Sequence, residues 1–469
     1  MLTRPATALV RLVAAGEVSA TELVRAHLDR IAALSQTLNA FVDLRAEQAL
    51  EEAERQDDAV ARGLPRGPLG GLPVTVKSAI EVPGLRCETG SPARAGRMAS
   101  GEAVVVARLR QAGAIVLGTT NVAEMLMAYE TDNPLHGRTL NPWDPSRTPG
   151  GSSGGEAAAI AVGCSAGGIG SDGGGSIRVP AHFCGICGLK PTPGRIPSTG
   201  HQPACLGPFS LIGVVGPLAR TIGDLRLLDR AVAGWDGGDP MAAPAAGDDA
   251  MRPPDSIRVA FFEGDGRVPV TSETRHAVRA AARAAAAAGF VVEEYRPPAL
   301  ERAGPLWDVF FAETGLLALH DELDGAEREL PILRAYLGRR ERLAPLSARD
   351  LLDAWATRDL VRADFVTQLG PSRVVICPVA AIPAFRHGER AWQVEGREVG
   401  YLDATRYSQW FNVLGAPAAV VPVTRTQEGL PVGVQVAGRP FDDDVVLQVA
   451  EAIERGCGGY RPPPGFDGA

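Results

Sequence analysis

Apolar and polar residues follow one another along the first sixty positions with the spacing of helices. The segment Ser19–Glu22 has the spacing of a capping box, a side-chain arrangement that begins many helices. Apolar Val24, Leu28 and Ile31 then recur at intervals of four and three positions, which places them on one helix face. A charged segment at 46–62 predicts another helix. We therefore expect the N-terminal region to be helical.

From residue 63 onward the pattern changes to short apolar runs separated by glycine and proline. Leu72–Val76 is such a run and predicts a short strand that delivers Lys77. The pattern further predicts helices at 104–113, 120–128, 271–288 and 442–455 and a helical region at 300–369. Further strands are predicted at 114–117, 256–262, 374–378, 418–423 and 432–436. A loop is predicted at 133–155, and tight glycine-rich turns at 163–200. Strands near both ends of the chain predict one sheet built from both halves.

Composition narrows the class of protein. Hydrophobic residues make up 45% of the 469 positions and charged residues 22%, which is ordinary for a globular protein. The net charge of −8 is spread along the chain without a basic block, so no nucleic-acid partner is expected. The N-terminus lacks the apolar run of a signal peptide, and the weakly polar run at 157–170 is too short to span a membrane. We expect a soluble, cytoplasmic protein whose seven cysteines, including Cys184 and Cys187, are buried thiols.

Lysine is nearly absent from the chain. Of 47 basic residues, only Lys77 and Lys190 are lysine, and all others are arginine. Arginine stays charged at any accessible pH, whereas a buried lysine can lose its proton and act as a base. The bias makes Lys77 a candidate base, while Lys190 is expected to be structural.

Two glycine-flanked serine segments are the densest candidates for chemistry, Pro149–Glu156 and Gly170–Pro180. Glycine lets a substrate carbonyl approach closely and leaves backbone N–H groups free to face an anion, as acyl transfer requires. The same glycines also permit weaker interpretations. Ser153 stands in a G-x-S-x-G pattern of α/β-hydrolases, Gly168–Gly173 fits a dinucleotide-binding pattern, and the segment fits a tight loop without chemistry.

These segments resemble the signature region of the amidase signature family. The resemblance continues through the segments Gly70–Lys77, Gly118–Val122, Asn141–Trp143, Ser171–Ala181, Phe183–Thr192 and Gly429–Gln435, in the family's order. It implies a single α/β/α domain with a large mixed central β-sheet covered by helices on both faces. Its implied parts are N-terminal helices (1–62), a catalytic core (63–240), a linker-like segment (241–255), a helical insertion (300–370) and a C-terminal α/β part of the same sheet (371–469).

The resemblance also implies a catalytic triad. Ser176 lies 24 residues after Ser152, as the family's nucleophile follows its bridging serine, and Lys77 matches the catalytic lysine. Ser152 is implied to follow a cis peptide bond. A serine hydroxyl is a weak nucleophile until a base takes its proton, so a neutral Lys77 is expected to activate Ser176 through Ser152. None of the seven histidines is needed by this mechanism.

Supporting residues follow from the same resemblance. The oxyanion hole is implied to consist of the backbone N–H groups of Gly173, Gly174, Gly175 and Ser176. Ser153 is expected to support this network, and Asp172 and Arg178 to pair and hold the glycine turn. Leu126 and Tyr129 are implied to line an acyl channel, although a core-facing helix end would give the same pattern. Departures from the family at Ser78, Thr119 and Ser171 leave the subfamily open.

The implied function is hydrolysis of a carboxylic amide to an acid and ammonia or an amine, through an acyl-enzyme on Ser176. No cofactor and no metal is implied, the partner is a small-molecule amide, and a homodimer is an allowed assembly. Two other enzymatic functions stay open. One is the glutaminase subunit of a tRNA-dependent amidotransferase, and the other is an α/β-hydrolase-type esterase that uses Ser153. A non-enzymatic glycine-rich binding protein is the third alternative.

Overall fold

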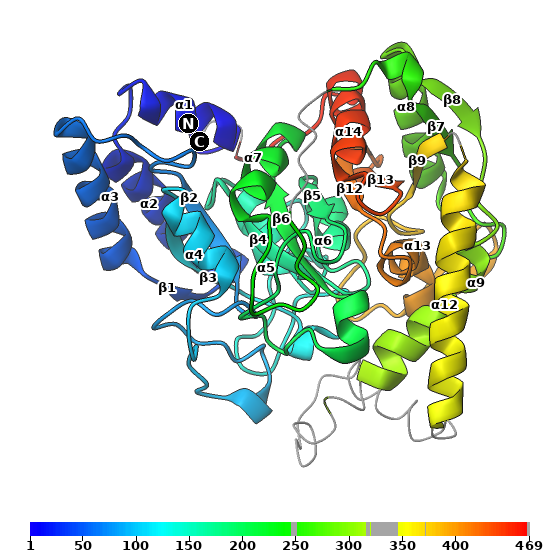
Figure 1. Ribbon diagram of the computed structural model, residues 1–469. Helices are drawn as coiled ribbons and strands as arrows, with labels where there is room; N and C mark the ends of the chain where they lie inside the picture. The colour runs from blue at the N-terminus through cyan, green and yellow to red at the C-terminus, as the bar shows by residue number, and fades with distance from the viewer. Residues whose placement is uncertain (245–250, 316–318, 320–345, 371, 467–469) are drawn as a thin grey trace.

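An eleven-stranded mixed sheet runs through the protein in the order β1-β3-β2-β4-β6-β5-β12-β13-β9-β7-β8 (Figure 1). The computed structural model describes residues 1–244, 251–315, 319, 346–370 and 372–466. The strands are β1 (Phe41–Leu44), β2 (Pro73–Lys77), β3 (Ile115–Thr120), β4 (Gly167–Asp172), β5 (Cys187–Lys190), β6 (Val214–Ala219), β7 (Arg258–Phe261), β8 (Val291–Glu294), β9 (Ser372–Pro378), β12 (Ala418–Arg425) and β13 (Pro431–Gly438). A separate hairpin consists of β10 (Ala391–Val394) and β11 (Arg397–Gly400).

The two halves of the chain meet where β5 pairs with β12. Ala418 lies opposite Lys190 and Ala419 opposite Leu189 in an antiparallel ladder. Strands from the first half form one side of this junction, and strands from the second half form the other. The prediction of one sheet built from both ends of the chain is confirmed.

Helices cover both faces of the sheet, so the architecture is the predicted α/β/α arrangement (Figure 1). One core includes Val420 of β12 and lies under α5 (Gly154–Ala161), α6 (Arg178–Cys184), α9 (Leu300–Trp307), α12 (Ala348–Leu369) and α13 (Tyr401–Val413). The other core includes the neighbouring Val421 and lies under α1 (Ala6–Ala14), α4 (Val104–Gln111), α7 (Ile222–Val232), α8 (Ser272–Ala287) and α14 (Asp443–Cys457). Successive strand residues point to opposite faces, so β12 contributes to both cores. Helices α2 (Ala20–Leu38) and α3 (Ala46–Ala61) pack at the β1 end of the sheet.

Several local predictions are confirmed in detail. Ser19 caps α2 through a capping box with Glu22, and Val24 and Ile31 are buried. Strand β2 ends at Lys77, as the apolar run before it predicts. All seven cysteines are free thiols, and six of them are buried. Among the described residues, no helix combines the length and apolar character that crossing a bilayer requires.

The helix predicted at 120–128 is wrong. Strand β3 continues to Thr120, and only a short 3-10 turn follows at Glu124–Leu126. Met125 and Leu126 have φ values of 46° and 63°, in the left-handed region that a helix excludes. The Met125 N–H donates to the Thr89 carbonyl, so a tertiary hydrogen bond takes the place of an α-helical one at this position.

Parts of two predicted segments lie outside the described residues. Of the linker-like segment 241–255, residues 245–250 are not described. Of the helical insertion 300–370, α9 and α12 are described together with a π-helical turn at Asp308–Glu313, whereas 316–318 and 320–345 are not.

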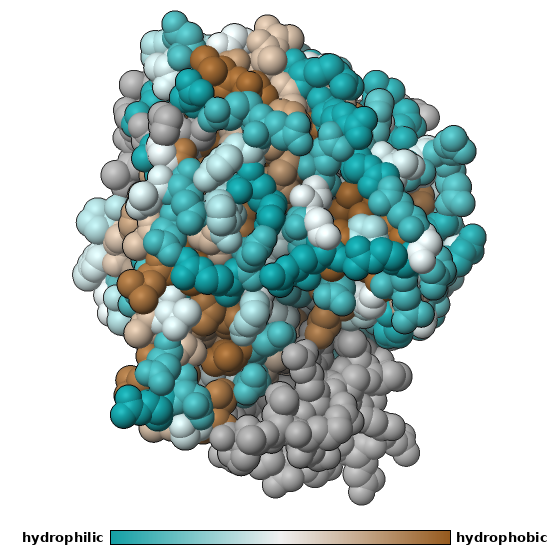
Figure 2. All heavy atoms as spheres, turned by 90° about the vertical axis from the view of Figure 1, so that its right-hand side faces the viewer, coloured by the Kyte–Doolittle hydropathy of each residue, from teal (hydrophilic) through white to brown (hydrophobic). Residues whose placement is uncertain are grey.

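The face that carries α9 and α12 is largely polar with separate apolar areas, and α12 exposes Leu352 and Leu360 (Figure 2).

Candidate active site

The sheet brings the predicted catalytic segments together. Strands β2 and β4 are parallel neighbours, with Thr75 opposite Gly168 and Val76 opposite Ile169. Their carboxyl ends therefore lie at the same edge of the sheet, where open α/β folds place their ligands. Lys77 is the last residue of β2, and the glycine turn directly follows β4.

Lys77 is completely buried and hydrogen-bonded to two serines. Its Nζ atom lies 2.7 Å from Ser152 Oγ, 3.0 Å from Ser171 Oγ and 3.4 Å from the Ser171 carbonyl oxygen. Burial lowers the pKa of Lys77 from its ordinary 10.5 to about 7, although the carboxyl groups of Asp172 and Glu156 raise it again in part. Lys77 is therefore able to exist as a neutral amine near neutral pH.

Ser152 and Ser176 both line a cavity of about 350 Å³. Ser152 is fully buried and follows a cis peptide bond after Gly151, as the resemblance implies. Ser176 keeps 7% of its surface exposed, so it is the serine that a substrate in the cavity meets first. Among the described residues, Lys77 is hydrogen-bonded to Ser152, whereas the hydroxyls of Ser152 and Ser176 both line the cavity without a hydrogen bond between them.

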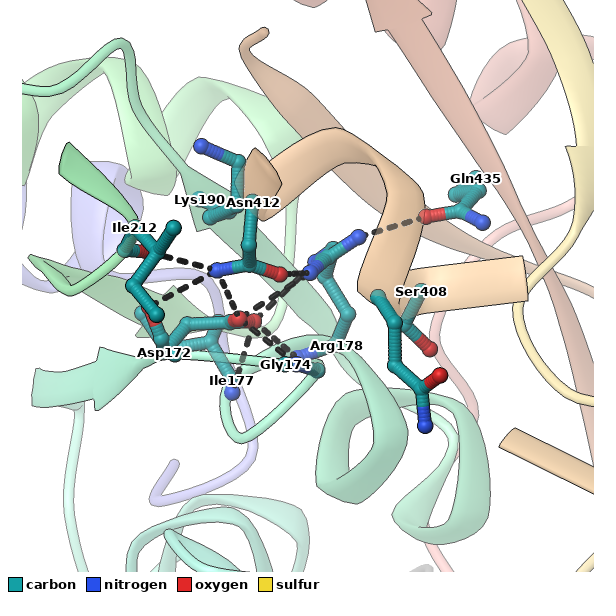
Figure 3. A network of polar contacts seen from close by, with 12 residues as sticks. Asp172, Gly174, Ile177, Arg178, Lys190, Ile212, Ser408, Asn412 and Gln435 are labelled. Atoms are coloured by element: carbon teal, nitrogen blue, oxygen red, sulfur yellow. Dashed lines mark hydrogen bonds and ion pairs between the residues drawn. The ribbon is translucent and has the colours of Figure 1, made fainter. Parts of the chain in front are cut away.

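A buried ion pair holds the glycine turn between β4 and α6 (Figure 3). Arg178 Nη2 and Nε each lie 3.0 Å from an oxygen of Asp172, and both side chains have no exposed surface. Asn412 of α13 donates to Asp172 and accepts from Arg178, and Gln435 of β13 accepts a further bond from Arg178. Burial alone would raise the pKa of Asp172, but Arg178, Lys190 and the hydrogen bond from Asn412 hold that pKa well below its usual value. The predicted Asp172–Arg178 pair is confirmed.

The backbone of the glycine turn is fixed by side chains on several sides. The Gly173 carbonyl accepts from Trp307 Nε1 and the Gly174 carbonyl from the Tyr129 hydroxyl, each at 2.9 Å. The Gly175 N–H donates to Asp172 Oδ1 at 2.7 Å. The Gly175 N–H is therefore already paired with Asp172 in this structure. Of the four predicted oxyanion donors, the N–H groups of Gly173, Gly174 and Ser176 are left as candidates.

Ser153 lies beside the backbone of Ser171 and Ser176. Its N–H donates to the Ser176 carbonyl at 3.2 Å, and its hydroxyl donates to the Ser171 carbonyl at 3.3 Å. Ser153 is fully buried and is absent from the cavity lining. A nucleophile must reach the substrate, so this geometry argues against the esterase alternative.

The two predicted substrate-binding residues have different positions. Leu126 lines the cavity that Ser152 and Ser176 also line, together with the apolar side chains of Met127, Leu206, Phe209, Val214 and Phe311. Tyr129 lies beside a smaller neighbouring cavity, which also contacts Ser176. The Tyr129 hydroxyl donates a hydrogen bond to the Gly174 carbonyl and accepts one from Gln409, so Tyr129 holds the glycine turn as well as lining this smaller cavity.

Sequence reasoning missed two polar groups next to Lys77. His201 lines the cavity and contacts Ser171 Oγ through Nε2 at 2.8 Å. Glu156 is fully buried and accepts hydrogen bonds from Thr75 and Thr120, which flank Lys77 on β2 and β3. Burial raises the pKa of Glu156 to about 7. The 45-residue gap between Glu156 and His201 gives no local signal that both face the lysine.

Comparison with known protein families gives a match over nearly the whole chain. The family model described as Amidase matches residues 22–447. The matched region contains Lys77, Ser152, Ser176 and the glycine turn.

Individual relatives agree with that match. The chain is 35% identical to an indoleacetamide hydrolase of Bradyrhizobium diazoefficiens over 94% of this chain and 84% of the relative. It is 34% identical to a subunit of the glutamyl-tRNA(Gln) amidotransferase of Anaeromyxobacter sp. (strain K), over 99% of this chain and 100% of the relative. Among solved structures, a bacterial aryl acylamidase of the amidase signature enzymes superposes with a TM-score of 0.85 at 26% identity, covering 99% of both chains.

Proposed function

The chain belongs to the amidase signature family and is an amidase, and we propose that it hydrolyses the amide of an apolar, aromatic carboxylic acid through Lys77, Ser152 and Ser176. The observation that carries this proposal is the 2.7 Å contact between buried Lys77 Nζ and Ser152 Oγ, beside a cavity that exposes Ser176. A base, a bridging hydroxyl and a reachable nucleophile then lie in one place.

The proposed reaction begins with two proton transfers. Neutral Lys77 takes the proton of Ser152, which takes the proton of Ser176, and Ser176 Oγ attacks the amide carbon. The N–H groups of Gly173, Gly174 and Ser176 are proposed to bind the negative oxygen of the tetrahedral intermediate. When the C–N bond breaks, the proton returns through Ser152 to the leaving nitrogen, which departs as ammonia or an amine.

An ester between the acyl group and Ser176 remains after this first half. A water molecule then attacks the same carbon while Lys77, through Ser152, takes its proton. The C–O bond to Ser176 breaks, the proton returns to Ser176 Oγ, and the carboxylic acid leaves. The two half-reactions together consume one water molecule and leave the enzyme unchanged.

The cavity wall supports an aromatic acyl group. Phe209 and Phe311 lie 5.7 Å apart between ring centroids and both face the cavity, together with Leu126 and Met127. A volume of about 350 Å³ lies at the lower end of small-molecule sites, which suits a one- or two-ring acid. The similarity to an indoleacetamide hydrolase supports the same substrate class.

Ammonia release from a panel of amides tests this proposal. We expect indole-3-acetamide and phenylacetamide to give kcat/KM values at least about tenfold above that of glutamine, because burial of a ring is worth more than about 1.4 kcal/mol. Phe209→Ala should lower kcat/KM for the aryl amides more than for an aliphatic amide of similar length. A purified enzyme that prefers glutamine would contradict the substrate assignment.

The glutaminase component of a tRNA-dependent amidotransferase is the second candidate. It is favoured by the 34% identity to a protein of a glutamyl-tRNA(Gln) amidotransferase over 99% of this chain. This candidate predicts weak glutamine hydrolysis by the isolated chain and a strong increase when partner proteins of such an amidotransferase are added. Aryl amide hydrolysis at full rate by the isolated chain would exclude it as the main activity.

A further inference from the structure

His201 contacts the catalytic network from the cavity side. It lies in the loop after β5, where it forms a β-bridge with Ile80, and its side chain is buried. Nδ1 lies 2.9 Å from the carbonyl oxygen of Pro203, and Nε2 lies 2.8 Å from Ser171 Oγ. Ser171 Oγ in turn lies 3.0 Å from Lys77 Nζ. The ring is thus one hydroxyl away from the proposed base.

The Pro203 contact determines which ring nitrogen carries hydrogen. A carbonyl oxygen only accepts hydrogen bonds, so Nδ1 must be the N–H donor. Burial lowers the pKa of His201 to about 4, so the ring is neutral near neutral pH and Nε2 is a lone-pair acceptor. The Ser171 hydroxyl therefore donates its hydrogen to His201. Cys205 Sγ, 3.6 Å from Nδ1, is compatible with an N–H there.

This direction fixes what Ser171 offers to Lys77. A hydroxyl that donates to His201 presents only lone pairs to the amine, so Lys77 must donate to Ser171 Oγ. The second acceptor on the same side is the Ser171 carbonyl oxygen, 3.4 Å from Nζ. A neutral amine has two N–H groups and one lone pair. With both hydrogens directed at Ser171, the lone pair faces the remaining neighbour, Ser152 Oγ, at 2.7 Å.

We propose that His201 sets the direction of the proton relay by holding the Ser171 hydroxyl away from Lys77, so that the lysine lone pair receives the Ser152 proton. His201 is thus a positioning residue, and its role rests on the proposed function of the triad. Without an acceptor at His201, the Ser171 hydroxyl is free to turn and donate to the lone pair. Ser152 then loses its acceptor in that fraction of molecules, and Ser176 is activated less often.

Other charged and titratable groups also face this network. Asp172 and Glu156 face Lys77, and their carboxylates raise its pKa, whereas Lys77 and Arg94 lower the pKa of His201. Burial raises the pKa of Cys205 to about 12, so its thiol stays protonated over the working range. A test must therefore separate the hydrogen-bond direction from a general change of charge. Substituting neutral His201 by a neutral residue meets that need.

The test is the rate of Ser176 labelling by an alkyl fluorophosphonate, followed by intact mass between pH 5 and 9. We expect His201→Leu to lower the plateau rate constant about tenfold. Its pH midpoint should move to lower pH, because a hydroxyl that donates to the amine stabilises the neutral form. His201→Gln keeps an acceptor oxygen near the Nε2 position and should stay within about threefold of wild type.

A double-mutant cycle with Ser171→Ala separates this role from simple packing. If His201 acts through the Ser171 hydroxyl, His201→Leu should change the rate by less than about twofold in the Ser171→Ala background. An equal loss in both backgrounds, or a wild-type rate and midpoint in His201→Leu, would overturn the proposal. His182→Leu is the matched control, because this other buried histidine accepts from Gly433 N–H and should leave the pH midpoint unchanged.

Failure of the His201 proposal is distinguishable from failure of the triad. If Lys77→Ala and Ser176→Ala label as wild type does, the triad itself is wrong. If those two variants lose labelling while His201→Leu retains it, the triad stands and the relay is oriented without His201.

Discussion

Lys77 shows at the scale of one residue why lysine persists in a chain whose other cations are almost all arginine. It is fully buried, and burial lowers its pKa to about 7. An arginine in this position would stay protonated and could not accept the Ser152 proton. The proposed mechanism needs a cation that is able to become neutral, and a buried lysine meets that need whereas an arginine does not.

Activity is expected to rise with pH through a midpoint near 7. Only the neutral amine of Lys77 accepts a proton, so the active fraction grows as pH increases through its pKa of about 7. The measurement is kcat/KM for an aryl amide from pH 5 to 9. Glu156→Gln should lower the midpoint, because the carboxylate of Glu156 raises the pKa of Lys77. A flat profile with chemistry rate-limiting would contradict the role of Lys77.

The buried base should lower the stability of the folded protein. Between pH 7 and 10.5 the unfolded chain holds a proton on Lys77 that the folded chain lacks, so the free energy of unfolding rises with pH. We expect Lys77→Met to raise the midpoint of thermal unfolding by several degrees at pH 7 and by less at pH 10. If Lys77→Met unfolds at a lower temperature than wild type at pH 7, buried Lys77 does not destabilise the folded protein.

Lys190 is the matched control for that experiment. It is equally buried, and burial lowers its pKa to about 7 as well, but its Nζ donates to the Pro191 carbonyl outside the reaction path. Lys190→Met should also stabilise the protein at pH 7. Labelling of Ser176 should survive in Lys190→Met and be strongly slowed in Lys77→Met.

The glycine turn shows, at the scale of one structural element, why these positions lack side chains. A Cβ on Gly173 would lie 2.8 Å from Phe311, and one on Gly174 would lie 2.8 Å from Trp307. Gly175 has a φ of +128°, which favours glycine, and a Cβ there would lie 2.8 Å from Ser408. The turn therefore lies against α9, α13 and the π-helical turn, so its N–H groups have a fixed direction.

Gly175→Ala should displace this turn and slow fluorophosphonate labelling of Ser176 at least about a hundredfold, because one misplaced oxyanion donor already costs that much. The labelling rate measured by intact mass checks this. Gly266→Ala is the matched control, since Gly266 also has a positive φ of 76° but has no atom within 4 Å of the added Cβ. Equal rates in both variants would show that the turn tolerates displacement.

Sequence patterns predicted elements best where the local signal was sufficient. The capping box at Ser19 and the apolar run before Lys77 both depend on a few adjacent residues, and both are confirmed. The segment at 120–128 has helical composition, but a hydrogen bond to Thr89 and the positive φ of Met125 prevent a helix. Helix α13 was not predicted at all, although it supplies Asn412 to the glycine turn.

The same distinction applies to the site. Family motifs are contiguous, so Lys77, Ser152 and the glycine turn could be located from sequence. His201 and Asn412 reach the site only through tertiary contacts, 30 and 240 residues from their partners Ser171 and Asp172. A single sequence carries no signal for such pairs.

The whole molecule depends on both halves of the chain at this site. Strand β5 pairs with β12, and Asn412 and Gln435 from the second half hold Arg178 of the first. We propose that residues 1–469 fold as one unit rather than as separable domains. Removing the second half would leave a buried arginine–aspartate pair without two of its partners and β5 without its neighbour.

A fragment of residues 1–244 should therefore fail to react with a fluorophosphonate, although it contains the entire proposed triad. Co-expression of 1–244 with 251–469 should restore labelling, because the β5–β12 ladder can form between two chains. Intact mass of the purified fragments provides the measurement. A fragment 1–244 that folds and labels alone would contradict a single folding unit.

The central claim is that Lys77 activates Ser176 through Ser152, and covalent labelling tests it most directly. Wild type, Ser176→Ala, Ser152→Ala and Lys77→Ala are treated with a fluorophosphonate and analysed by intact mass and peptide mapping. We predict one adduct on Ser176 in the wild type, none in Ser176→Ala, and labelling slowed at least about a hundredfold in the other two. An adduct that persists in Ser176→Ala, or unchanged rates in Lys77→Ala, would contradict the mechanism.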